Sequence, residues 1–112
     1  MKRKYEFTGE VNESGLKQIK RISDGLVGGF IEGEYNLSHN GNCFVHHNAQ
    51  VFDNAEVCGD AKVCENAQVF DDAQIYGNAE VSGNAWVSGN ARIFGNARVF
   101  GYARVSNNVK IK

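Results

Sequence analysis

A six-residue repeat, which runs from about Asn42 to Lys112, constrains the fold more than any other feature of the sequence. Each unit has an aliphatic residue at one position and a small residue four positions later, and no unit is lost or gained. The aliphatic positions are Val45, Val51, Val57, Val63, Val69, Ile75, Val81, Val87, Ile93, Val99, Val105 and Ile111. The small positions are Ala49, Ala55, Ala61, Ala67, Ala73, Ala79, Ala85, Ala91, Ala97 and Ala103, with Val109 in the last unit. Such self-similarity decides the architecture before local propensities do.

Within each unit a small, a variable, an aliphatic and a second variable residue precede two turn residues, mostly Gly, Asn, Asp or Glu. The small and aliphatic residues are two apart, so in an extended segment they point to the same side. A helix does not fit this spacing, because six is not close to a multiple of 3.6. A flat hairpin sheet does not fit either, because nothing in the pattern reverses the inward side. The chain is therefore predicted to coil through short strands and bends.

The first forty residues follow a different pattern. Residues 1–11 alternate aromatic and polar side chains around Tyr5 and Phe7, which is typical of a half-exposed strand. A turn-rich stretch follows at residues 12–15, and residues 16–22 favour a second strand, with a short helix as the alternative. The Gly28-Gly29 pair lies in no phosphate-loop or dinucleotide-binding context, so we interpret it as a source of backbone freedom.

The repeat extends, with larger residues, toward the N-terminus. Counting back in steps of six from Ala49 places Cys43, Leu37 and Ile31 at the small position. We expect these larger residues to plug the open end of the coil, since solenoids need atypical terminal units. The sequence therefore predicts an N-terminal β-hairpin-like cap over residues 1–24 and a repeat domain over residues 25–112, regular from about residue 42. No comparable cap is visible toward Lys112.

The hexads resemble the hexapeptide repeat of left-handed parallel β-helix proteins, in which three hexads form one triangular coil. The variant here has the form V-[FYS]-G-N-A, and the chain also contains KYEFTGE and GGFIEGEYNLSHNGNCFV. These segments resemble a short phage-encoded and prophage-associated subset, whose members are often labelled as transferases. The resemblance implies an all-β fold, a single-stranded left-handed parallel β-helix (a hexapeptide-repeat solenoid) with a small N-terminal β cap.

Stacking the sequence by eighteen residues predicts which outward side chains become neighbours. It places Phe52 over Phe70 on one face and Tyr76 over Phe94 on another, with Trp86 one coil before Arg104. Clustered aromatic side chains mark interfaces. We therefore expect a self-association surface among Phe52, Phe70, Tyr76, Phe94 and Phe100, with simple stabilisation of the coil as the alternative.

Charge is segregated along the repeat, although the net charge is only −1. Residues 50–80 hold seven acidic residues and one lysine, whereas residues 81–112 hold five basic residues and no acidic one. We expect Arg92, Arg98, Arg104 and Trp86 to contact a phosphate-bearing ligand, with a merely solvated surface as the alternative. The three arginines fall on three different faces, so such a pocket would be shared between subunits. The net charge makes nucleic acid an unexpected partner.

Histidine is the side chain suited to general-base chemistry near neutral pH, and in the hexapeptide acyltransferases a histidine acts as the base. His46 and His47 are the candidates here, but the chain lacks the inserted loop and C-terminal helix of those enzymes. The two lie too close to His39 for the metal site of the carbonic-anhydrase branch of this fold. Cys64, one coil beyond His46, is interpreted as a chance neighbour. We therefore predict no metal, no cofactor and reduced cysteines.

The sequence thus favours a non-enzymatic, phage-type accessory binding protein that forms a dimer or trimer. It would inhibit a bacterial antiviral defence system, either by binding a protein component or by sequestering a nucleotide signal. The alternatives are a hexapeptide acyltransferase with a histidine base and a structural, self-assembling module. No signal peptide or membrane-spanning run is visible, so the cytoplasm of the bacterial host is the expected location.

Overall fold

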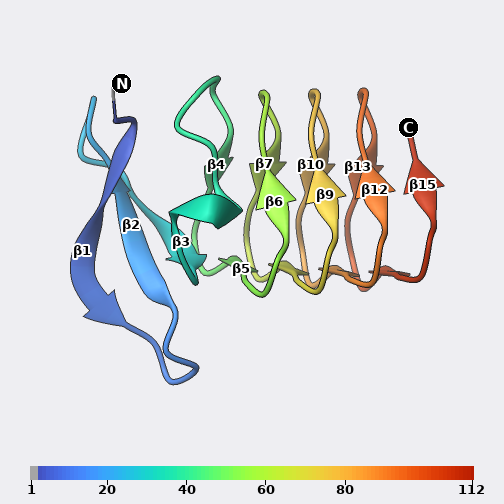
Figure 1. Ribbon diagram of the computed structural model, residues 1–112, viewed down its shortest axis with the longest axis horizontal. Helices are drawn as coiled ribbons and strands as arrows, with labels where there is room; N and C mark the ends of the chain where they lie inside the picture. Colours follow the sequence, from blue (N-terminus) through green and yellow to red (C-terminus); the bar gives the residue numbers. More distant parts are fainter. Residues whose placement is uncertain (1–2) are drawn as a thin grey trace.

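The computed structural model describes residues 3–112 and shows a row of stacked coils closed at one end by a hairpin (Figure 1). The N-terminal part contains β1 (Tyr5–Val11), β2 (Lys17–Arg21), β3 (Val27–Ile31) and the short 3-10 helix η1 (Glu34–Asn36). The coils contain twelve two-residue strands: β4 (Phe44–Val45), β5 (Gln50–Val51), β6 (Glu56–Val57), β7 (Lys62–Val63), β8 (Gln68–Val69), β9 (Gln74–Ile75), β10 (Glu80–Val81), β11 (Trp86–Val87), β12 (Arg92–Ile93), β13 (Arg98–Val99), β14 (Arg104–Val105) and β15 (Lys110–Ile111).

The twelve short strands form the sides of a triangular prism. Each strand pairs in parallel with the strand eighteen residues later, as Glu80 does with Arg98 and Val81 with Val99. Three sheets result, in the orders β5-β8-β11-β14, β4-β7-β10-β13 and β6-β9-β12-β15. The front strands in Figure 1 run upward, and the chain then passes over the top to the back while the coils advance to the right, which makes the coils left-handed. The predicted parallel β-helix is confirmed.

The interior of the prism contains the two columns predicted from the repeat. Val45 to Ile93 in the aliphatic column and Ala49 to Ala91 in the small column are essentially inaccessible to solvent. The backbone at each corner turns through a residue with positive φ. This residue is Gly at many corners, and at five others it is His47, Asp53, Glu65, Asp71 or Asn107. Between the corners, the backbone N–H groups of one coil donate to carbonyls of the next, which connects the coils along the axis.

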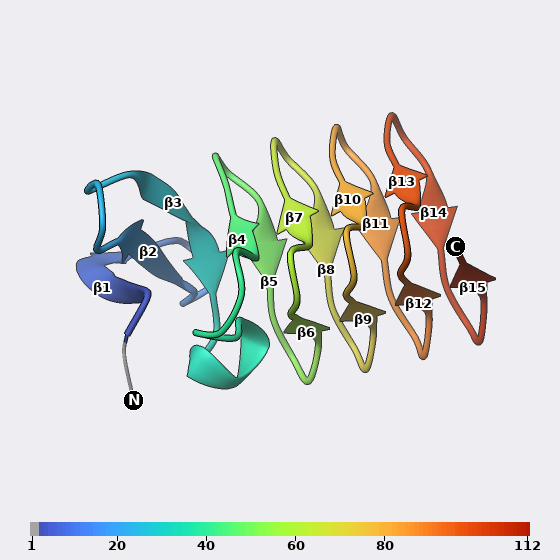
Figure 2. The ribbon, with the colours of Figure 1, turned by 90° about the horizontal axis from the view of Figure 1, so that it is seen from above.

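The N-terminal cap extends one side of the prism. β1 and β2 pair antiparallel, β2 and β3 pair antiparallel, and β3 pairs in parallel with β5, so all three join the sheet β5-β8-β11-β14 (Figure 2). Residues 16–22 contain the strand β2, as preferred over a helix, while Met1 and Lys2 of the first predicted strand lie outside the described residues. Tyr5 is fully buried in the cap, where its hydroxyl donates to the Leu37 carbonyl at 2.6 Å.

Counting back by six gave the wrong position for two residues of the first coil. Ile31 pairs with Val51, and Leu37 forms a bridge with Val57, so both lie in the aliphatic column and not in the small one. The offset arises at residues 38–43, where the corner is two residues longer than the later ones and breaks the period. The expectation that large residues fill this end holds, since Ile31, Leu37 and Cys43 are all fully buried.

The role predicted for Gly28-Gly29 was also wrong. A side chain on Gly29 would lie 2.4 Å from the Ala49 carbonyl oxygen, and one on Gly28 would lie 2.7 Å from the Phe44 ring. Both glycines are buried within β3 and neither has a positive φ. They are therefore needed because β3 packs closely on the first coil, not for backbone freedom.

Candidate binding surfaces

The outward side of β5, β8, β11 and β14, which we call the Trp86 face, brings together two groups of residues that the sequence had treated separately. Phe52 stacks on Phe70 with ring centroids 5.1 Å apart, and Phe70 meets Trp86 edge-on at 6.3 Å. The Arg104 guanidinium lies over the Trp86 ring, 4.3 Å from its centroid. An uninterrupted aromatic and cationic run therefore follows this face across four coils, and Trp86 is its most exposed aromatic side chain at 41%.

Arg104 is already occupied within the chain. Its Nη1 donates to the carbonyls of Asn84 and Tyr102, each at 3.1 Å, while the guanidinium plane rests on Trp86. A guanidinium held in this way has fewer donors left for a phosphate than the free side chain has. The predicted stacking is confirmed, and the contacts favour Arg104 as a part of the Trp86 face over a separate phosphate ligand.

The outward side of β6, β9, β12 and β15, which we call the Tyr76 face, carries the second aromatic stack. Tyr76 and Phe94 lie parallel with centroids 5.2 Å apart, and both are half-buried. The same face presents Glu56, Gln74, Arg92 and Lys110 in successive strands. Its charges therefore change from negative to positive along the prism, whereas its centre is aromatic.

The third sheet carries the remaining predicted residues. Phe100 is 68% exposed beside β13, without a ring of the preceding coil beneath it. Arg98 belongs to β13, Arg92 to β12 and Arg104 to β14, so the three arginines lie on three different sheets. A single chain does not bring them together around one ligand, as the sequence had indicated.

The two candidate bases lie near the cap. His46 is half-buried with its ring edge-on to Phe44 at 5.1 Å. Desolvation by burial lowers the pKa of His46, and the nearby charges of Arg21 and His47 lower it further. His47 is exposed at a corner, where its Nδ1 accepts a hydrogen bond from the Glu65 amide at 3.2 Å. The ring neighbours of His46 are Phe44 and His47, and neither is a carboxylate or hydroxyl group that would orient a general base.

The thiol beside His46 is not activated. Burial raises the pKa of the Cys64 thiol, with Glu65 and Glu80 adding to the effect. Burial likewise raises the pKa of Cys58, and the three cysteines are free thiols. A nucleophilic cysteine needs the opposite shift, because the thiolate is the reactive form. The raised pKa of Cys64 therefore does not favour a catalytic pairing of this thiol with His46.

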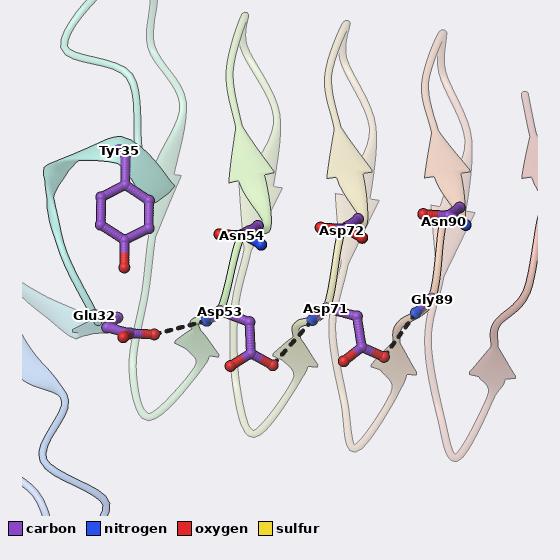
Figure 3. A pocket seen from close by; sticks show the side chains of 8 residues that line it. All are labelled: Glu32, Tyr35, Asp53, Asn54, Asp71, Asp72, Gly89 and Asn90. Atoms are coloured by element: carbon purple, nitrogen blue, oxygen red, sulfur yellow. Dashed lines mark hydrogen bonds between the residues drawn. The ribbon is translucent and has the colours of Figure 1, made fainter.

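An acidic groove of about 550 Å³ lies along one corner of the prism, and sequence reasoning missed it (Figure 3). Glu32 accepts from the Asp53 amide at 2.8 Å, Asp53 from the Asp71 amide at 3.2 Å, and Asp71 from the Gly89 amide at 3.0 Å. Each carboxylate thus satisfies the corner of the next coil. The spacing of eighteen between Asp53 and Asp71 was the signal that could have revealed this ladder.

The ladder of Glu32, Asp53 and Asp71 is explained by the hydrogen bonds through which each carboxylate holds the corner of the next coil. Tyr35 stands beside its first member, and Asn54, Asp72 and Asn90 line its far side (Figure 3). In the part of the chain that the structure describes, no group of three or more His, Cys, Asp or Glu side chains could hold a metal ion. Asp71 itself is a corner residue, with a φ of 58° and a carboxylate that accepts from the amide of the next corner.

Comparisons with known proteins support the architecture. Residues 73–89 and 91–107, from β9 to β14, match a family model described as the YdcK beta solenoid repeat. No curated protein matches the chain. None of the helical segments in residues 3–112 has the length and apolar character needed to cross a membrane. The repeated match agrees with the stacked parallel coils, and the chain is built of β-solenoid repeats.

Proposed function

We propose that this protein is a non-enzymatic, self-associating binding protein. One aromatic face closes against a second copy, and the rest of the rigid prism presents side chains to a partner. The observation that supports this best is the pair of half-buried aromatic stacks, Phe52 on Phe70 and Tyr76 on Phe94, on two separate sheets. Aromatic side chains are enriched at protein interfaces, and a prism with alanine in half of its inward positions gains from further burial.

The contacts of the histidines support a role without catalysis. His39 uses both ring nitrogens inside the cap, accepting from the Lys4 amide at 3.1 Å and contacting Glu34 at 2.7 Å. His47 uses one nitrogen on the Glu65 amide, and His46 faces the apolar Phe44 ring. An acyltransferase would need one of these rings free and oriented beside an acceptor group.

The partner we propose is a protein component of a bacterial antiviral defence system, as the resemblance to phage-encoded proteins implies. Sequestering a nucleotide signal is the other form of the same role. It would require Arg92, Arg98 and Arg104 to meet across subunits, because they lie on separate sheets. The aromatic run on the Trp86 face, with Arg104 already committed to it, favours protein over nucleotide.

Sedimentation velocity over a range of protein concentrations tests the self-association. We expect a discrete dimer or trimer that dissociates on dilution. The double variants Phe52→Ala/Phe70→Ala and Tyr76→Ala/Phe94→Ala are compared, with circular dichroism as the control for folding. The pair that dissociates the oligomer identifies the closed face.

A wild-type protein that stays monomeric at every concentration contradicts the self-associating part of this proposal. Filaments that grow with concentration would support the structural, self-assembling module in its place. Turnover of acetyl-CoA that disappears in His46→Ala would overturn the non-enzymatic part.

A further inference from the structure

The geometry points to a specific arrangement of the oligomer: two copies pair through the Tyr76 face with their prisms running in opposite directions. This inference rests on the proposed self-association and adds the face, the orientation and the contacts. The partner it commits to is a second copy of this chain. The face consists of four aligned rows of outward side chains, and each row belongs to one strand of the sheet β6-β9-β12-β15.

When the Tyr76 face is reversed and laid against a second copy of itself, acidic residues meet basic ones. From β6 to β15, the residue that precedes the aliphatic position is Glu56, Gln74, Arg92 and then Lys110. Consider a two-fold axis in the plane of the interface, parallel to the strands and midway between β9 and β12. This axis reverses the prism and places the β6 row of one copy against the β15 row of the other. Glu56 then faces Lys110 of the second copy, and Gln74 faces Arg92, at both symmetric positions.

The aromatic column follows the same relation. Tyr76 of one copy faces Phe94 of the other, so the two stacked pairs meet at the centre of the interface. Such a centre of aromatic side chains with charges toward the ends is the usual anatomy of a protein interface. Because Tyr76 and Phe94 are already half-buried and stacked in each chain, little side-chain freedom is lost on pairing.

The charges also select the orientation. If the prisms ran in the same direction, the two-fold axis would lie along the prism and each row would face the same row of the other copy. The two Glu56 side chains would then share one row, the two Arg92 side chains a second and the two Lys110 side chains a third. Like charges brought together in this way are unfavourable at an interface. Glu56 and Lys110 cannot satisfy each other within one chain, because three strand spacings of about 4.8 Å each separate their rows. Among residues 3–112, none of Glu56, Arg92 and Lys110 takes part in an ion pair.

The other two faces do not combine complementary charges with a stacked aromatic centre. Reversal of the Trp86 face would place Gln50 against Arg104, whose guanidinium is already bound to Trp86 and to two carbonyls. The hairpin turn at Ser14–Leu16 also lines a hollow over this face, so a flat partner would meet the cap. On the third sheet, reversal would also place Lys62 against Glu80, but these two residues are already neighbours in one chain. The centre of that face holds Cys64 and Ser82 in place of an aromatic stack, and Phe100 has no ring of the preceding coil beneath it.

Charge reversal tests this arrangement directly. Glu56→Lys and Lys110→Glu should each weaken the dimer about tenfold, because two symmetric attractions become repulsions. The double variant Glu56→Lys/Lys110→Glu should return the dissociation constant to near the wild-type value. Glu13→Lys, on the exposed hairpin turn, changes the net charge as Glu56→Lys does and should leave the dimer unchanged. Circular dichroism of each variant confirms that the coils are intact.

Zero-length crosslinking of the wild-type dimer gives a second readout. A carbodiimide should join Glu56 of one copy to Lys110 of the other, and mass spectrometry of the dimer band should find that peptide pair. If the protein forms a dimer but the reversals act no more strongly than Glu13→Lys, the Tyr76-face arrangement is overturned while the self-association stands. If the wild-type protein is monomeric, both fail. The arrangement is supported if each single reversal weakens the dimer and the double variant restores the wild-type dissociation constant.

Discussion

The N-terminal cap and the regular coils share one sheet but are stabilised in different ways. In the coils, the same few contacts recur every eighteen residues: Val against Val, Ala against Ala, and backbone N–H to the carbonyl of the next coil. In the cap, each contact occurs once and joins residues far apart in the sequence. Lys4, for example, binds the Cys43 carbonyl and contacts the Cys43 thiol at 3.2 Å.

Because of this difference, the residues that stabilise the fold and the residues available for binding lie in different parts of the molecule. Because the coils depend only on their inward columns and corners, their outward positions are free to vary, and aromatic and charged side chains collect there. The cap and the irregular first coil have little such freedom, since Tyr5, Ile19 and Leu37 are fully buried and Asn36 has its amide satisfied on both sides. Changes at the cap should therefore affect stability, whereas changes on the outer faces of the coils should affect association.

The largest difference is expected for a buried leucine of the irregular first coil, beside the cap. Leu37→Ala should lower the free energy of unfolding by about 2–5 kcal/mol, because it leaves a cavity at a fully buried position. Val69→Ala, in the middle of the coils, removes fewer buried atoms and should cost less, about 1.5–3 kcal/mol. Urea denaturation followed by circular dichroism measures both. An equal or larger loss at Val69 would mean that the irregular end of the coil is no more sensitive to a cavity than its middle.

A smaller difference is expected between two kinds of glycine. Gly29→Asn should lower the free energy of unfolding by about 1–3 kcal/mol, because the new Cβ would meet the Ala49 carbonyl oxygen at 2.4 Å. Gly101→Asn should change it by less than about 1 kcal/mol, because this corner has open space and asparagine tolerates a φ of +65°. Thermal unfolding of the two variants checks the distinction. Equal losses would mean that space is not what limits Gly29.

The smallest effect concerns an exposed ionic contact of the cap. The hydrogen bond from His39 lowers the pKa of Glu34, and the nearby charge of Arg3 adds to this. The carboxylate thus stabilises the fold above its unfolded pKa of about 4.3, and this contribution is lost as the pH falls through the lower folded value. Because Glu34 is largely exposed, Glu34→Gln should cost only about 0.2–1 kcal/mol at neutral pH.

The measurement for Glu34 compares unfolding at neutral and acidic pH. The gap between wild type and Glu34→Gln should close in acid, and added salt should narrow it at neutral pH. Glu13→Gln on the hairpin turn is the matched control and should show no such dependence. A gap that persists in acid would assign the effect to packing and not to charge.

Most of the coil architecture followed from the repeat itself. The spacing of Val and Ala predicted which side faces inward, and stacking by eighteen predicted the neighbours Phe52 with Phe70, Tyr76 with Phe94, and Trp86 with Arg104. These predictions succeed because each unit repeats the same local geometry, so a residue's neighbours are found by adding a constant. The acidic ladder of Glu32, Asp53 and Asp71 partly obeys the same rule and was open to the same reasoning.

Only the tertiary structure decided what happens where the period is broken. The longer corner at residues 38–43 moved Ile31 and Leu37 into the aliphatic column, and the close packing of β3 explained Gly28-Gly29. Likewise, the hydrogen bonds of Arg104 to the Asn84 and Tyr102 carbonyls depend on the conformation of its side chain, which the repeat does not specify. A repeat specifies local geometry many times over, whereas contacts made once across the chain depend on how far its irregular segments reach.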